Sequence, residues 1–273
     1  MQNRRAYVKI LLYTTDALPS VKGRIPAQKA CIMNPRAGIS FPAKRSMNMP
    51  KTNLKTLAYN AIREKIVTCE FAPGTFLNEE ILTGALGLSR TPIRDALSRL
   101  EQEGLVEIKP KRGIMVTPLT VNDINMIFEV RNLYEPYILL NYGSLLSTDR
   151  LEKFYNISLQ TNADSEYFQN NDYFYNLDSD FHLMIVECCP NAYIRNNYNL
   201  IRTQNARFRY MTGNISNNRM EDTFREHLDI IRPCLQKNWK EAAEMMTIHL
   251  EESKKATFRL IFQGHENTPI GLF

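Results

Sequence analysis

The chain contains four histidines, and three of them occur in a pattern that could bind a metal ion. Asp178 and His182 are four residues apart in the segment LDSDFHLMI, so on a helix they share one face. His227 and His249 fall in two further segments with helical apolar spacing. An aspartate oxygen and imidazole nitrogens suit Zn²⁺, Ni²⁺, Mn²⁺ or a similar divalent ion. Spacing alone leaves a second interpretation open, in which each histidine is an ordinary core or surface residue.

A second group of residues could bind an anion. The stretch GLSRTPIRDALSRL, residues 87–100, places Ser89, Arg90, Thr91 and Arg94 at the start of a predicted helix. Arginines are unfavourable beside the positive end of a helix dipole unless an external anion compensates them. Helix amides and hydroxyls bind phosphate oxygens, and the planar arginine fork matches guanine or phosphate. The alternative is a solvated face on which the arginines pair with nearby acidic residues.

Three helices are predicted around this stretch. Helical apolar spacing begins at Leu54, and the segment FAPGTFL at 71–77 ends that helix in a Pro-Gly turn. Asn78 is expected to cap a second helix, and Gly87 permits the tight bend that follows it. Ser89 or Thr91 caps the third helix, which tolerates Pro92 only because that residue lies in its first turn.

A basic β-ribbon is predicted directly after the third helix. Two short apolar segments, LVEI and IMVTP, flank the sequence KPKRG, which supplies Lys111, Arg112 and Gly113 to the tip. Two helices joined by a tight turn and followed by a ribbon form a winged helix-turn-helix. In that motif the second helix of the pair enters the major groove of double-stranded DNA. The sequence therefore predicts a DNA-binding unit.

The charge distribution limits where DNA can bind. Residues 1–50 contain nine Lys or Arg and one acidic residue, whereas residues 120–273 contain fifteen against twenty. An acidic C-terminal half excludes a protein that wraps a polyanion along its whole length, so any nucleic-acid contact is expected to be local. The five cysteines form no regular spacing, and no apolar run approaches the ~18 residues of a membrane helix. We therefore expect a cytoplasmic protein, associated with the bacterial nucleoid when bound to DNA.

The rest of the chain is predicted to be helical. The segment TVND at 120–123 resembles a capping box with Asp in place of Glu, and Pro136 should kink or open the helix that follows. Helices are expected at 121–146, 149–169, 172–189, 192–212, 217–237 and 239–262. Residues 1–50 are expected to form a basic arm, which is either disordered or precedes a true start at Met47 or Met49. The arm is followed by the winged domain at 51–119, an all-helical domain at 120–263 and a loose tail at 264–273.

The predicted DNA-binding unit resembles the GntR family of bacterial repressors. The resemblance covers residues 54–118, including GLSRTPIRDAL, where the family core reads Gly-Val-Ser-Arg-Thr-Pro-Val-Arg-Glu-Ala-Leu. Glu80 stands where some relatives have a DNA-contacting arginine, and Arg99 either touches a phosphate or pairs with Glu103. The resemblance implies that the DNA-contacting positions are Ser89, Arg90, Thr91, Arg94 and Gly113, and the wing composition adds Lys111 and Arg112.

The C-terminal part resembles the FCD effector domain of the FadR-type subfamily. The elements that carry the resemblance are D-x-x-F-H in the segment DSDFH, then E-H, then A-x-x-x-M-x-x-H-L. The resemblance implies an antiparallel all-helical bundle and a divalent metal held by Asp178, His182, His227 and His249. Asp180 is a rival carboxylate, but it lies on a different helix face from His182.

An effector pocket is expected beside the metal. Arg131 and Glu135 resemble the subfamily's Arg-x-x-x-Glu, and Arg131 could clamp a carboxylate with both ends of its guanidinium. An intrahelical pair between Arg131 and Glu135 is an equal alternative. Arg202, Asn205 and Arg209 could reach this cavity, although a position on the helix surface is favoured.

Together these features predict a ligand-responsive transcription regulator that binds a palindromic operator as a homodimer, and the subfamily resemblance implies that it is a repressor. The expected effector is a small carboxylic acid. A regulator with the metal ion itself as effector is one alternative, and a metal-dependent hydrolase or lyase is another. We expect no enzyme, because no nucleophile motif or paired acid and base accompanies the histidines.

Overall fold

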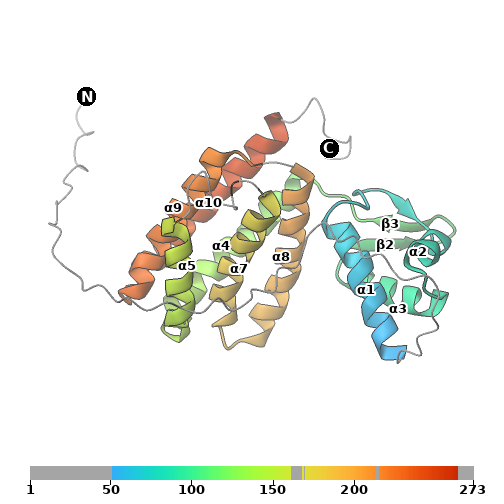
Figure 1. Ribbon diagram of the computed structural model, residues 1–273, viewed down its shortest axis with the longest axis horizontal. Helices are drawn as coiled ribbons and strands as arrows, with labels where there is room; N and C mark the ends of the chain where they lie inside the picture. The colour runs from blue at the N-terminus through green and yellow to red at the C-terminus, as the bar shows by residue number, and fades with distance from the viewer. Residues whose placement is uncertain (1–50, 161–167, 169, 213–214, 264–273) are drawn as a thin grey trace, which may run out of the picture. The chain divides into compact units, whose positions relative to one another are not determined.

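The structure is a computed structural model that describes residues 51–160, 168, 170–212 and 215–263 (Figure 1). The expectations for the arm at 1–50 and for the tail at 264–273 lie outside these residues. No helix in the described ranges is both long and apolar enough to cross a membrane. The described part is mostly helical and contains one small sheet, so the predicted fold class is confirmed.

The first elements form the predicted winged helix-turn-helix. In chain order they are α1 (Lys51–Val67), β1 (Phe76–Leu77), α2 (Glu79–Leu86), α3 (Arg90–Gln102), β2 (Val106–Lys109) and β3 (Gly113–Val116). The sheet is antiparallel in the order β1-β3-β2. Strand β1 was not expected, because the two residues Phe76 and Leu77 are too few to show an alternating pattern. Their pairing with Met115 and Ile114 creates the strand.

Local signals position α2 and α3 as the sequence predicts. The Asn78 side chain accepts a hydrogen bond from the amide of Ile81, and Gly87 ends α2 in the left-handed conformation with φ of 64°. Ser89 is the N-cap residue of α3, although its side chain makes no capping hydrogen bond. One hydrophobic cluster holds these helices together, and its fully buried members include Ile62, Leu82, Ile93, Leu100 and Leu105.

The remaining described chain is helical. Its elements are α4 (Val121–Tyr142), the 3₁₀ turn η1 (Gly143–Leu145), α5 (Thr148–Gln160), α7 (Asn171–Glu187), α8 (Ala192–Thr212), α9 (Asn217–Leu235) and α10 (Trp239–Gln263). Thr120 and Asp123 form the expected capping box. α4 continues as one helix through Pro136 and ends at Tyr142, four residues earlier than expected. At Gly143 a Cβ atom would lie 2.4 Å from the ring of Trp239, so close packing accounts for glycine where the chain turns.

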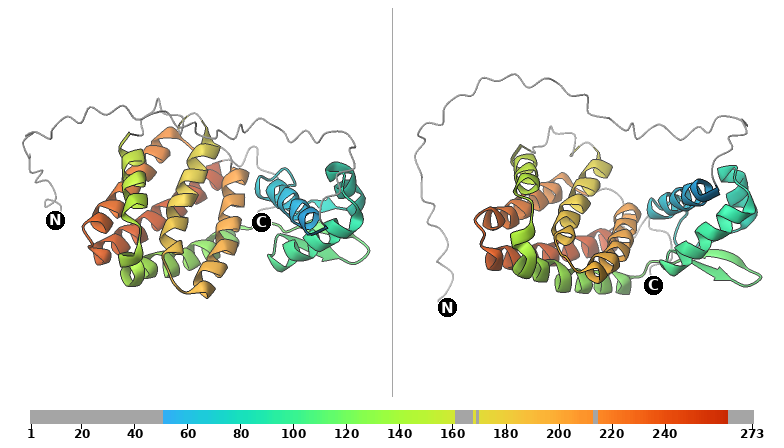
Figure 2. Two further views of the ribbon diagram at one scale, coloured as in Figure 1. Left: turned by 60° about the horizontal axis from the view of Figure 1, so that its bottom comes forward. Right: turned by 90° about the horizontal axis from the view of Figure 1, so that it is seen from below.

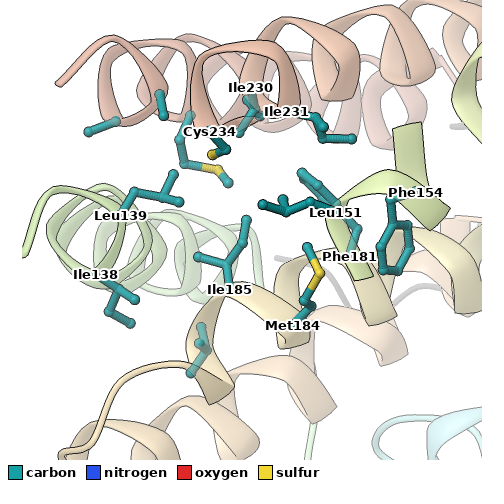
Figure 3. Packing of buried hydrophobic residues seen from close by; sticks show 14 of the residues in the cluster. Ile138, Leu139, Leu151, Phe154, Phe181, Met184, Ile185, Ile230, Ile231 and Cys234 are labelled. Carbon is teal, nitrogen blue, oxygen red and sulfur yellow. The ribbon is translucent and has the colours of Figure 1, made fainter. Parts of the chain in front are cut away.

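The helical part surrounds one large apolar core. Helix α10 packs against α4 and α9, α5 packs against α9, and α7 lies beside α8 (Figures 1 and 2). Figure 3 shows Phe181, Met184 and Ile185 of α7 facing Leu139 of α4 and Ile231 of α9 across this core. A rigid core of this kind fixes the directions in which the polar residues on the same helices point.

Candidate metal centre and nucleic-acid interface

The four predicted metal ligands converge inside the helical part. Helix α7 supplies Asp178 and His182, α9 supplies His227, and α10 supplies His249. All four side chains are buried, with Asp178 the most accessible at 5 %. One donor atom from each lies within 4.8 Å of the other three. Asp180, the rival carboxylate, is exposed and is not part of this group.

The separations between donor atoms suit a single ion. Asp178 Oδ1 lies 3.4 Å from His227 Nε2 and 3.7 Å from His182 Nε2. His182 Nε2 lies 3.1 Å from His249 Nε2. Ligands that bind one Zn²⁺ at about 2.0–2.2 Å in tetrahedral geometry are separated from each other by roughly 3.3 Å. The distances therefore leave space for one small cation between the donors.

The hydrogen bonds of two histidines direct lone pairs into this space. His182 Nδ1 is 2.6 Å from Glu135 Oε2, and His249 Nδ1 is 2.7 Å from Glu226 Oε2. An ionised carboxylate can only accept, so each Nδ1 carries the hydrogen and donates it. In the neutral state both Nε2 atoms then carry lone pairs that face each other. Such an arrangement needs a proton or a cation between the two nitrogens.

His227 contributes an unpaired nitrogen to the same space. Its Nε2 atom is buried and has no hydrogen-bond partner among the described residues. Its ring stacks on Phe181 with 4.1 Å between the ring centres, which fixes the direction of that nitrogen. Burial lowers the pKa of His227, so the imidazole remains neutral and able to act as a ligand. An orphaned buried nitrogen beside a carboxylate fits a metal ligand.

The charged residues around the centre determine the protonation of its members. Burial alone raises the pKa of Asp178, but Arg209 and His182 outweigh burial and hold that pKa well below its ordinary value. Burial also lowers the pKa of His182, yet Glu135 outweighs this and raises it. Burial lowers the pKa of His249 to about 3. His182 is therefore the histidine that most readily takes the proton a metal ion would displace.

Three ion pairs surround the donors. Arg131 Nε donates to Glu135 at 2.7 Å, which is the intrahelical alternative considered above, and both side chains are buried. Arg209 pairs with the second oxygen of Asp178. The third pair joins Arg219 to Glu226 at 2.5 Å. Neither Glu226 nor Arg219 was predicted to be a site residue, although Glu226 is the glutamate of the E-H element that contains His227.

Small cavities adjoin the centre. Arg131, Arg202, Asn205 and Arg209 line a space of about 10 Å³ that His182 also reaches. A neighbouring space of about 50 Å³ is lined by Arg131, Asp178, Arg209 and Arg219. Arg209 therefore reaches the site directly, although sequence reasoning favoured a position on the helix surface. Arg131 lines both cavities.

The predicted DNA-contacting residues of α3 lie together on the surface. Ser89, Arg90, Thr91 and Arg94 are all exposed at the N-terminal end of the helix, while Pro92 and Ile93 are buried beneath them. Arg94 Nε donates to Glu79 of α2 at 2.7 Å, and this pair raises the pKa of Arg94. Glu79 of α2 therefore holds the exposed guanidinium of Arg94 near the N-terminal end of α3.

The wing places further basic residues near this helix end. Lys111 and Arg112 are exposed at the turn between β2 and β3, and the Arg112 guanidinium lies 5.3 Å from the ring centre of Phe76. A groove of about 510 Å³ runs between α3 and the wing, with Arg94, Lys109, Lys111 and Gly113 among its lining residues. Arg99 instead pairs with Glu103 at 3.2 Å and stacks on Tyr59, as the structural alternative for that residue expects.

Two family models match the chain. The model described as bacterial regulatory proteins of the gntR family matches residues 54–116, and the FCD domain model matches residues 127–252. Together they cover the winged unit and most of the helical part. The chain belongs to the gntR family of bacterial regulatory proteins.

Curated relatives and solved structures agree with this family. The HTH-type transcriptional repressor RspR of Escherichia coli K12 is 29 % identical over 196 residues, which is 71 % of this chain and 84 % of RspR. YdhC of Bacillus subtilis, a regulator of the same type, is 25 % identical over 77 % of this chain and 93 % of its own length. The structure of E. coli McbR/YncC superposes with a TM-score of 0.64 at 15 % identity, covering 76 % of this chain and 98 % of that one. A GntR transcriptional regulator from Rhodococcus sp. RHA1 superposes with a TM-score of 0.62 at 18 % identity over the same shares of the two chains.

The protein is therefore a DNA-binding transcriptional regulator of the GntR type with an FCD domain. Its helical part contains a buried cluster of one aspartate and three histidines that could hold a metal ion.

Proposed function

We propose that this regulator binds one divalent metal ion through Asp178, His182, His227 and His249, and that a small carboxylic acid binds beside the ion to control its hold on DNA. The observation that carries the metal proposal is the pair of Nε2 atoms 3.1 Å apart, each with its Nδ1 bonded to a carboxylate. A divalent cation would supply the charge that these facing lone pairs need. Zn²⁺, Ni²⁺ and Mn²⁺ all accept this mixture of nitrogen and oxygen ligands.

The charge balance of the site favours an anionic effector. Three carboxylates and three guanidinium groups cancel around the neutral histidines, and they form the pairs Glu135 with Arg131, Asp178 with Arg209 and Glu226 with Arg219. A bound divalent ion leaves this buried region with two uncompensated positive charges. A carboxylate would neutralise at least one of them, and Arg131 or Arg209 could bind it with two parallel hydrogen bonds. A neutral ligand would leave both charges in place.

The DNA-binding proposal assigns roles to the surface of the winged unit. Ser89, Arg90, Thr91 and Arg94 would meet the major groove and its phosphates. Lys111, Arg112 and Gly113 would contact the backbone or the minor groove at the wing. We infer that the regulator acts in the cytoplasm as a homodimer on a palindromic operator. Two winged units related by a twofold axis would match the two half-sites of such an operator. The name of the relative RspR supports a repressor rather than an activator.

A regulator with the ion itself as effector is a second candidate. The cavities beside the centre measure about 50 and about 10 Å³, whereas small-molecule pockets are usually about 300 Å³ or larger. An organic acid would therefore need the side chains around Arg209 to move, and a metal ion would not.

The test compares wild type with His227→Ala and with Cys234→Ala, a buried change on the same helix outside the donor group. We expect elemental analysis and native mass spectrometry to find one metal ion per wild-type and Cys234→Ala chain and none in His227→Ala. Metal should also raise the unfolding temperature of the first two, since metal at about a hundred times its dissociation constant adds about 2.7 kcal/mol. Full occupancy in His227→Ala would refute the assignment.

DNA binding then separates the two candidate effectors. Operator fragments selected by the protein are titrated with zinc alone, with chelator, and with zinc plus mono- and dicarboxylic acids. Release of DNA only when acid is added to the zinc-loaded protein supports the carboxylic effector. Release by zinc alone identifies the ion as the effector.

A further inference from the structure

Two glutamates, Glu135 and Glu226, contact histidines of the candidate metal centre. Neither is one of the four proposed metal ligands or part of the proposed DNA-binding surface. Glu135 of α4 is completely buried, and its Oε2 accepts from His182 Nδ1 at 2.6 Å. Glu226 of α9 is mostly buried, and its Oε2 accepts from His249 Nδ1 at 2.7 Å. In both cases the carboxylate lies on the side of the imidazole that faces away from the other donors. Neither glutamate shares a helix with the histidine it contacts.

Each carboxylate is itself held in place by other residues. Glu135 Oε1 accepts from Arg131 at 2.7 Å and from the hydroxyl of Tyr198 at 2.8 Å, which leaves Oε2 for His182. With Arg131 and Tyr198 on one oxygen and His182 on the other, both oxygens of this buried carboxylate accept hydrogen bonds.

The second glutamate is anchored in the same way. Arg219 binds both oxygens of Glu226, at 2.5 and 3.0 Å, and donates a further hydrogen bond to the hydroxyl of Ser253 on α10. Arg219 of α9 therefore anchors Glu226 as Arg131 of α4 anchors Glu135.

We propose that Glu135 and Glu226 are positioning residues that hold His182 and His249 with their Nε2 atoms directed at the bound ion. The proposal rests on the metal binding proposed above. A fixed Nδ1–H selects the tautomer whose Nε2 lone pair is free, and the adjacent negative charge makes that nitrogen a stronger donor. Removing such an outer carboxylate typically costs about tenfold to a hundredfold in metal affinity. A purely structural role would change stability and leave the affinity for metal unaltered.

The experiment measures zinc affinity of the full chain by competition with a chromophoric chelator. The variants are Glu135→Gln and Glu226→Gln, which keep the shape of the side chain and remove its charge. The controls are Glu187→Gln on α7 and Glu221→Gln on α9, which change exposed glutamates on ligand-bearing helices. We expect each test variant to bind zinc about tenfold to a hundredfold more weakly and each control to match wild type.

A second readout detects the histidine geometry directly. Long-range ¹H–¹⁵N spectra of the zinc-free wild type should show His249 with hydrogen on Nδ1, and Glu226→Gln should shift that population toward Nε2. If Glu135→Gln fails to fold because Arg131 loses its charged partner, Glu226→Gln decides the question alone. Unchanged zinc affinity in a folded Glu226→Gln overturns the inference. A wild-type chain that binds no zinc overturns the proposed function and this inference together.

Discussion

At the scale of single residues, the exposed arginines of α3 differ in how firmly they are held. Arg94 is bonded to Glu79 on the neighbouring helix, whereas Arg99 is bound to Glu103 and stacked on Tyr59. The first pair orients a guanidinium whose side chain is still 66 % exposed. DNA phosphates or bases can approach that guanidinium without breaking any packing contact, so it is the more suitable residue for groove contact.

We therefore expect Arg94→Ala to weaken operator binding by roughly tenfold to a hundredfold, because one arginine contact to a base or phosphate is lost. Fluorescence anisotropy with a labelled operator, at fixed salt, measures the change. Arg225→Ala is the matched control, since Arg225 is 67 % exposed and also pairs with a neighbouring carboxylate, but lies on α9. Equal operator affinity in Arg94→Ala and wild type, with unchanged unfolding temperature, would remove Arg94 from the interface.

At the scale of secondary structure, the elements with strong local signals were predictable. The capping residues Asn78 and Thr120 and the glycine at Gly87 begin or end helices where the sequence indicated. The four donors were named from the sequence because the family resemblance points to all of them, whereas spacing on one helix face connects only Asp178 and His182. Glu226 was missed because its partner, His249, is 23 residues away on another helix. Only packing between helices brings the two together, and no local pattern encodes that contact.

The wing shows how backbone geometry limits sequence choice within an element. Gly113 begins β3 with φ of 106°, and a Cβ atom there would lie 2.7 Å from the carbonyl oxygen of Leu77 in β1. Lys111 also has positive φ, at 62°, but it lies in the exposed turn. Glycine at 113 therefore serves the sheet itself, in addition to any approach to DNA.

Gly113→Ala is expected to destabilise the winged unit by about 1 to 3 kcal/mol, since the residue would be strained and would press on β1. Chemical denaturation followed by circular dichroism gives the free energy of unfolding. Gly84→Ala, in the middle of α2 with open space around the added methyl group, should be neutral or stabilising. If both substitutions left the free energy of unfolding unchanged or raised it, the close approach of Gly113 to Leu77 would not limit the stability of the winged unit.

At the scale of the whole molecule, α4 has two faces with different partners. One face buries Arg131, Glu135 and Ile138 against the candidate metal centre and the core. The opposite face carries an apolar stripe of exposed side chains, namely Met126, Leu133, Tyr137 and Leu140. Their spacing of seven, four and three residues places them on one side of the helix. A continuous apolar stripe on a helix surface is typical of a site where a second protein binds.

In the homodimer proposed above, a second copy of α4 would cover this stripe, because a twofold axis lets the same face pair with itself. Leu133 is the most exposed member at 62 % and would become buried in both copies. Leu133→Asp should therefore weaken dimerisation by about 3 kcal/mol or more, roughly a hundredfold in the dissociation constant, because two leucines lose their burial. Light scattering coupled to gel filtration measures the mass across a dilution series.

The matched control is Leu159→Asp on α5, where an exposed leucine lies outside the stripe. We expect this control to remain a dimer and to bind the operator as wild type does. At concentrations between the wild-type dissociation constant and the weakened one, Leu133→Asp should be monomeric and bind a full palindrome no better than a half-site, since two winged units no longer act together. A Leu133→Asp protein that stays dimeric at nanomolar concentration would show that the two subunits pair through another surface. In that case α4 would not connect the candidate metal centre with the partner subunit.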